Sequence, residues 1–161
     1  MLGNTEQINR DYLYESIAKI GLNYPDTEIL DKLFTMFDDS GENCVIYTDY
    51  LAACSILTTS SHSDKLALAL EIYDKNNIGT ITRGDVRKCL QALNLATSYF
   101  GDPVIEDDEI IQMLNDCYSK SNSPISQVKY AELLPFIIES QVFFKYICGL
   151  GTKRYVKQQL I

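Results

Sequence analysis

Apolar residues recur at helical spacing in three stretches of the chain. In the segment 30–37 they fall at i, i+3, i+4 and i+7, and the segments 66–73 and 110–117 follow the same spacing. The residues concerned are Leu30, Leu33, Phe34, Phe37, Leu66, Leu70, Tyr73, Ile110, Met113, Leu114 and Cys117. Each stretch predicts an amphipathic helix with its apolar face in a core.

A longer repeat connects these helices. Branched apolar anchors stand at Ile8, Val45, Ile81 and Ile125, separated by 37, 36 and 44 residues. Five residues after each anchor comes a second apolar or aromatic side chain, namely Leu13, Tyr50, Val86 and Tyr130. This period predicts four repeats of a helix, a polar loop and a helix, with a longer spacer before the last repeat.

A helix, a twelve-residue polar loop with an apolar eighth residue and a second helix resemble the EF-hand, in which the eighth residues of paired loops form a short β-bridge. The resemblance implies an all-α protein with two lobes of paired EF-hands. We expect lobes over 1–60 and 61–135 and a helical tail over 136–161. The first hand is expected to be incomplete, because only seven residues precede Ile8.

The resemblance also implies ion ligands in two loops. In the loop 38–49 these are Asp38, Ser40, Glu42, the carbonyl of Cys44 and Asp49, and in the loop 74–85 they are Asp74, Asn76, the carbonyl of Thr80, Thr82 and Asp85. Ile46 and Ile78 supply no side-chain oxygen where a ligand belongs. Asp49 and Asp85 are shorter than the glutamate that binds calcium through both oxygens. We therefore expect weak calcium binding, with magnesium-tolerant binding or loss of the ion as alternatives.

The last loop is predicted at 118–129. Lys120 and Lys129 take the places of ligands there, so no metal is expected in it.

Composition narrows the classes of function. The net charge of −8 argues against a nucleic-acid partner and favours a basic protein or cations, although an acidic surface also serves solubility alone. The five cysteines include no CxxC, and no apolar signal segment is present, which favours free thiols and a cytoplasmic location, with cytoskeletal or ciliary association as a variant. No phosphate loop or nucleophile motif occurs, so we do not expect an enzyme.

The segment "DKLALALEIYDKNNIGTITRGDVRKCLQAL" is similar to the third hand of the calcineurin B, neuronal calcium sensor and calaxin group. That group also has a stretched spacer, as in 94–111 here, and a long tail. The resemblance implies an adaptor that binds a basic amphipathic helix of a larger protein. A true calcium sensor and a regulatory subunit of an enzyme such as a calcineurin-type phosphatase are the alternatives.

Two apolar surfaces are candidates for partner binding. The amino-terminal lobe, short of one helix, is expected to expose Leu13, Ile17, Ile20, Leu33 and Phe37, unless its own side chains or a dimer close it. In the tail, Pro135 is expected to kink or end the last hand, and a second helix over 136–148 to follow. Its residues Phe143, Phe144 and Ile147 would fill a groove between the lobes or complete the carboxy-terminal core. Charges within the tail exclude a membrane span.

Overall fold

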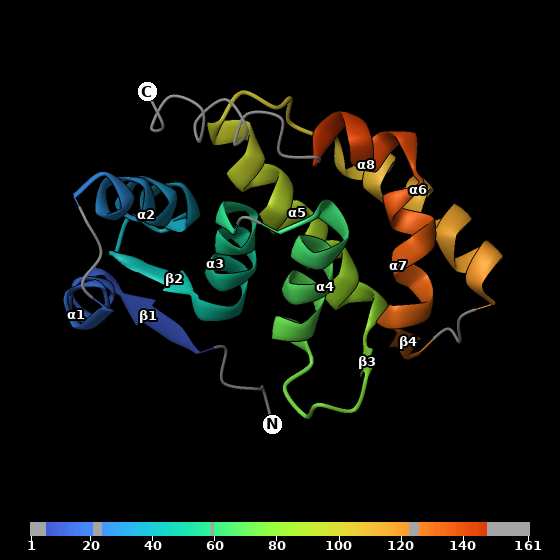
Figure 1. Ribbon diagram of the computed structural model, residues 1–161, viewed down its shortest axis with the longest axis horizontal. Helices are drawn as coiled ribbons and strands as arrows, with labels where there is room; N and C mark the ends of the chain where they lie inside the picture. Colours follow the sequence, from blue (N-terminus) through green and yellow to red (C-terminus); the bar gives the residue numbers. More distant parts are fainter. Residues whose placement is uncertain (1–5, 21–23, 59, 123–125, 148–161) are drawn as a thin grey trace. The chain divides into compact units, whose positions relative to one another are not determined.

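The computed structural model describes residues 6–20, 24–58, 60–122 and 126–147. The chain forms two compact units, Met1–Leu51 and Ala52–Ile161, which are described separately. Both units are built from helices, and each carries one two-stranded antiparallel sheet (Figure 1). This confirms the prediction of a mostly helical fold in which short strands pair between loops.

Unit 1 contains one pair of helix–strand repeats. Its elements are β1 (Gln7–Asn9), α1 (Arg10–Ile20), α2 (Tyr24–Phe37), β2 (Cys44–Ile46) and the start of α3 (Tyr47–Cys54). Ile8 of β1 pairs with Val45 of β2, as the repeat predicted. Leu33 and Phe34 of α2 are fully buried, and the Tyr50 ring meets Phe34 edge-on at 5.6 Å. The predicted stripe of α2 therefore forms the core of this unit.

Unit 2 contains the second pair of repeats and the tail helix. Its elements are η1 (Ser55–Leu57), α4 (His62–Tyr73), β3 (Thr80–Ile81), α5 (Arg83–Tyr99), α6 (Asp107–Ser121), β4 (Val128–Lys129), α7 (Tyr130–Ile138) and α8 (Gln141–Tyr146). The helix α7 packs against both α4 and α6, and β3 lies beside β4 (Figure 1). The predicted apolar stripes of α4 and α6 are buried, apart from the half-buried Tyr73.

The pairing of β3 with β4 corrects the predicted register of the last repeat. Ile81 pairs with Val128, whereas Ile125, the predicted anchor, lies outside the described residues. The helix α6 continues to Ser121, because Tyr118 is still buried on its apolar face. The last loop therefore spans 121–132 rather than 118–129, and Leu133, five residues after Val128, is the fully buried residue of the repeat.

The predicted effect of Pro135 also needs correction. The helix α7 passes through Pro135 and ends at Ile138, so the break comes three residues later than expected. A proline removes a single helical hydrogen bond, and the carbonyl of Pro135 still accepts one from the Glu139 amide at 3.1 Å. The tail helix then starts at Gln141, with the Ser140 hydroxyl as its N-cap.

A buried amide connects the spacer and the tail helix to α5. Asn94 donates hydrogen bonds of 2.9 Å to the carbonyls of Pro103 and Tyr146, and its own oxygen accepts one of 2.9 Å from the Ile105 amide. The hydroxyl of Thr97 also donates to the Tyr146 carbonyl at 2.9 Å. These bonds satisfy polar groups that burial would otherwise penalise, and they hold the end of α8 against α5.

Candidate functional site: the paired loops and a groove beside the tail helix

The loop 38–49 has the backbone shape of an EF-hand loop. The carboxylate of Asp38 accepts a hydrogen bond of 2.9 Å from the Asn43 amide and one of 3.2 Å from the Ser40 hydroxyl. Asn43 adopts φ 59°, the left-handed conformation that its place in the loop requires. Ser40 and Glu42 are exposed, and Cys44 and Asp49 are half-buried.

The loop 74–85 is centred on a buried carboxylate. Asp74 is only 4% exposed, and its oxygens accept hydrogen bonds from the amides of Gly79 at 2.7 Å and Ile78 at 3.1 Å. A third hydrogen bond, 3.0 Å long, comes from the hydroxyl of Tyr130, the first residue of α7. Burial acts to raise the pKa of Asp74, but these hydrogen bonds outweigh it and hold the pKa below its usual value.

Asp85, the expected final ligand of the same loop, is engaged at the start of α5. Its carboxylate accepts hydrogen bonds from the Thr82 hydroxyl at 2.7 Å and the Thr82 amide at 3.3 Å. The Thr82 hydroxyl in turn accepts one from the Asp85 amide at 3.0 Å, which completes a capping box. Two predicted ligands are thus bonded to each other. The Ile78 side chain, 64% exposed, offers no oxygen.

These positions decide how well calcium fits the two loops. Within the described residues, no three side chains of Asp, Glu, His or Cys converge where they could hold a metal ion. In the loop 74–85, Asp74 already accepts three internal hydrogen bonds and Asp85 is bonded to Thr82, so a calcium ion would have to compete with these contacts for both carboxylates. Among the expected ligands, the loop 38–49 has three carboxylates and the loop 74–85 has two.

The corrected last loop also lacks a metal site in its described part. It begins at Ser121, and Lys129 follows the strand anchor Val128. Its final residue, Glu132, lies 3.4 Å from the Lys129 amine in an exposed ion pair. Asn122, with φ 49°, terminates α6 in the left-handed conformation.

The predicted partner-binding residues divide between buried and exposed positions. Leu13 and Leu33 are buried within unit 1, contrary to the expected exposed patch, and Phe37 is half-buried. They are covered because α1 and α2 pack together and the Tyr50 ring lies against Phe37. The side chains of Ile17 and Ile20 lie outside the described part of the structure.

The tail residues behave similarly. Phe143 and Ile147 are buried and line a small cavity with Leu66 and Leu93 of the same unit, which agrees with the alternative that this helix completes its own core. Phe144 is 59% exposed, with its ring near that of His62. Residues 148–161 of the predicted tail lie outside the described residues.

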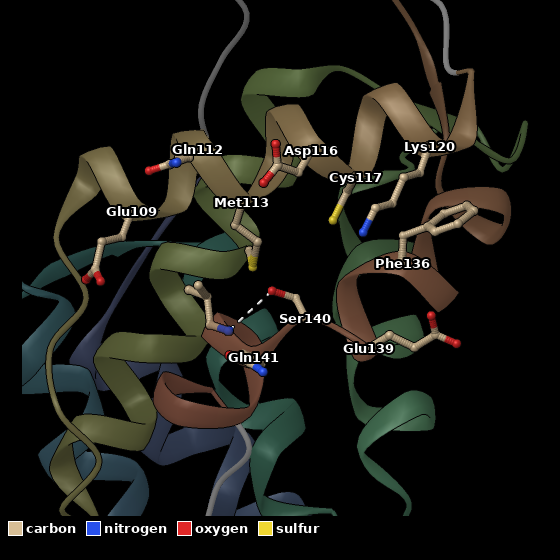
Figure 2. Close-up of a pocket in the computed structure, with 11 residues that line it drawn as sticks. Glu109, Gln112, Met113, Asp116, Cys117, Lys120, Phe136, Glu139, Ser140 and Gln141 are labelled. Atoms are coloured by element: carbon tan, nitrogen blue, oxygen red, sulfur yellow. Dashed lines mark hydrogen bonds between the residues drawn. The ribbon is translucent and has the colours of Figure 1, made fainter.

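A groove of about 490 Å³ lies between α6, the end of α7 and the start of α8. Its apolar lining comes from Met113, Cys117, Phe136 and Val142, and its polar lining from Glu109, Gln112, Asp116, Lys120, Glu139, Ser140 and Gln141. Figure 2 shows the sulfur atoms of Met113 and Cys117 turned into this space. Three carboxylates against one amine give the groove an acidic rim. The Cys117 thiol is free, and burial raises its pKa, so it packs as an apolar group.

Each strand is followed by a helix that leaves the loop, called here the exit helix of its hand. Sequence reasoning did not single out the residues that start these exit helices. The helices α1, α3, α5 and α7 begin at Arg10, Tyr47, Arg83 and Tyr130, each two residues after a strand anchor. The guanidinium of Arg10 lies 4.7 Å above the Phe34 ring, and that of Arg83 lies 4.1 Å above the Tyr118 ring. The alternation of Arg and Tyr at this place was readable from the sequence once the correct anchors were known.

Known proteins resemble parts of the chain. No family model matches it. A recoverin family protein of Dictyostelium discoideum is 30% identical over 93 residues, covering 55% of this chain and 41% of the relative. Guanylyl cyclase inhibitory protein of Lithobates pipiens is 30% identical over 67 residues, 42% of this chain and 32% of the relative.

The calcium-binding protein NCSA of Dictyostelium discoideum is 24% identical over 86 residues, 53% of this chain and 45% of the relative. The chain spans less than half the length of these curated relatives. None of the helices in the described part of the chain combines the length and apolarity that crossing a bilayer requires.

Proposed function

From the premise that this chain is an EF-hand protein with relatives of the recoverin and neuronal calcium sensor type, we propose that it is a regulatory adaptor that binds a basic amphipathic helix of a larger protein. It acts by binding rather than by catalysis, in the cytoplasm. The observation that supports this proposal is the acidic, partly apolar groove between α6, α7 and α8.

The groove suits a helix with one apolar and one basic face. Met113, Cys117 and Phe136 offer an apolar floor to the anchoring side chains of such a helix. Asp116 and Glu139 are exposed at the rim, where they would attract lysine and arginine and raise the rate of encounter. The net charge of −8 adds a general attraction for basic partners.

Calcium has a secondary place in this proposal. The loop 38–49 would hold it weakly, through Asp38, Ser40, Glu42, the carbonyl of Cys44 and Asp49, with magnesium as a competing ion. The positive charge of the bound ion would offset the negative charge of the carboxylates in this loop. We propose that loops 74–85 and 121–132 are degenerate and bind none.

A second candidate is supported by the names of two relatives. Guanylyl cyclase inhibitory protein and guanylyl cyclase-activating protein 2 of Gallus gallus, which is 24% identical over 71 residues, are named for an effect on an enzyme. A regulatory subunit of an enzyme is therefore the alternative. In that case the partner helix would belong to the enzyme.

A charge-matched pair of variants tests the groove. We expect a fluorescent amphipathic peptide of leucine and lysine to bind the protein in an anisotropy titration, and Asp116→Asn/Glu139→Gln to weaken binding severalfold at low salt. The control Asp108→Asn/Glu132→Gln makes the same change in net charge at exposed residues outside the groove lining. Equal weakening by both pairs, or no binding to the unmodified protein, contradicts the proposed site.

A further inference from the structure

In unit 2, the first residue of α7 reaches the loop of the neighbouring hand. Tyr130 donates its hydroxyl to Asp74 across 56 residues of sequence. With the amides of Ile78 and Gly79, it is the third donor on this carboxylate. An ionised carboxylate offers about four acceptor positions, and burying it requires partners that compensate its charge. Here neutral donors from the chain itself provide that compensation.

In unit 1, the first residue of α1 makes the corresponding contact. Arg10 donates a hydrogen bond of 3.1 Å from Nε to the side-chain oxygen of Asn43, the turn residue of loop 38–49. The same guanidinium pairs with Asp31 and donates one of 3.1 Å to the Thr35 hydroxyl, both on α2. The loop 38–49 and the helix that enters it are therefore tied to the preceding hand by a protein cation.

These two contacts have the same place in the repeat. Arg10 and Tyr130 each stand two residues after the strand anchor of their hand, and each binds a loop residue of the hand whose strand pairs with its own. Such contacts join paired loops independently of any ion. In 74–85 they also oppose an ion, because a cation at Asp74 would have to displace the Tyr130 hydroxyl or share the remaining acceptor position.

We propose that these exit-helix residues replace the loop ion as the link between paired hands: Arg10 holds loop 38–49, Tyr130 holds loop 74–85, and both loops keep their shape without calcium. This inference does not depend on the partner helix, and its tests use the protein alone. It predicts that chelation leaves the structure of both units unchanged.

The stability of variants tests the Tyr130 contact. We expect Tyr130→Phe to lower the folding equilibrium constant of the full chain about five- to thirtyfold, measured by urea unfolding in chelator. Tyr99→Phe, which removes the hydroxyl of an exposed tyrosine on α5, is the matched control and should leave it unchanged. Asp74→Asn should lower it as well, and the double variant should lose less than the two single losses combined. A Tyr130→Phe variant as stable as the unmodified protein overturns the proposal.

The effect of calcium on thermal stability provides a second, independent test of the inference. The Asp38→Ala/Asp49→Ala variant removes the first and last ligands of loop 38–49, so a calcium response that remains comes from elsewhere. We expect its thermal midpoint to be the same in chelator and in millimolar calcium. A rise in calcium that disappears when Asp74→Asn is added would show that Asp74 binds the ion, which contradicts the inference while leaving the partner proposal intact.

Amide hydrogen exchange tests the same inference in the unmodified protein, so it does not depend on whether a variant folds. In the unmodified protein, the Ile78 and Gly79 amides bonded to Asp74 should be protected equally with and without calcium. Protection that appears only when calcium is present overturns the inference.

Discussion

Replacing Asn94 by leucine should destabilise unit 2 strongly, although the two side chains have the same number and branching of heavy atoms. Asn94 is 2% exposed and takes part in three hydrogen bonds of 2.9 Å, which join α5 to Pro103, Ile105 and Tyr146. Leucine fills the space but can neither donate nor accept. The polar groups of the spacer and of α8 would then face an apolar side chain.

The magnitude follows from the partners left behind. Each lost hydrogen bond removes about 1 kcal/mol, and each buried group left without a partner costs about 1–3 kcal/mol. The Ile105 amide and the Pro103 carbonyl lose this partner, whereas the Tyr146 carbonyl still accepts from Thr97. The apolar gain of leucine offsets part of the loss, so we expect Asn94→Leu to lower the free energy of unfolding by about 2–5 kcal/mol.

Urea unfolding followed by far-UV circular dichroism measures this change, since the chain has no tryptophan to report by fluorescence. Thr97→Val is the matched control: it removes one donor from the Tyr146 carbonyl and leaves the Asn94 donor in place, so about 1 kcal/mol is expected. If the free energy of unfolding of Asn94→Leu lies within about 0.5 kcal/mol of that of the unmodified protein, the buried amide does not hold α8 and the spacer as described.

Three further predictions concern other parts of the molecule. Burial raises the pKa of Tyr118 to about 12, so this tyrosine should be among the last to ionise in an absorbance titration. Its contribution to stability should be complete below pH 10 and lost as the pH rises toward 12. The Tyr118→Phe variant should therefore lose less stability over this alkaline range. Leu133→Ala, at a fully buried position, should lower the free energy of unfolding by about 2–5 kcal/mol, whereas the half-buried Leu134→Ala should cost less; equal losses would contradict the corrected register. Ile78→Asp combined with Asp85→Glu should raise calcium affinity in calorimetry by restoring ligands to loop 74–85, and two submicromolar sites in the unmodified protein would refute the account of its loops.

The sequence predicted the repeat well where local patterns carry the information. The strands at Ile8, Val45 and Ile81 could be predicted, because a branched apolar residue within a polar loop is a strong local signal. The last anchor was misplaced by three residues, nearly one helical turn, because Ile125 and Val128 are both branched. Leu133, five residues after Val128, was the signal that separates them.

Other features depend on contacts between distant segments. Asn94 meets Tyr146 from 52 residues away, and Tyr130 meets Asp74 from 56 residues away. Neither pair leaves a periodic trace in the sequence. The ligand count of loop 74–85 was readable, but the commitment of Asp85 to its capping box and of Asp74 to Tyr130 required the three-dimensional arrangement.

We propose that this EF-hand protein binds a basic amphipathic helix in the groove of unit 2. Because both loops of that unit are proposed to bind no ion, this binding should not require calcium. The most direct measurement is a ¹H–¹⁵N NMR titration of the full chain with the leucine–lysine peptide, once in chelator and once in calcium. The account predicts peptide-dependent shifts at Gln112, Asp116, Lys120 and Phe136 that are the same in both conditions. Shifts that require calcium, or that lie away from the groove, would contradict it.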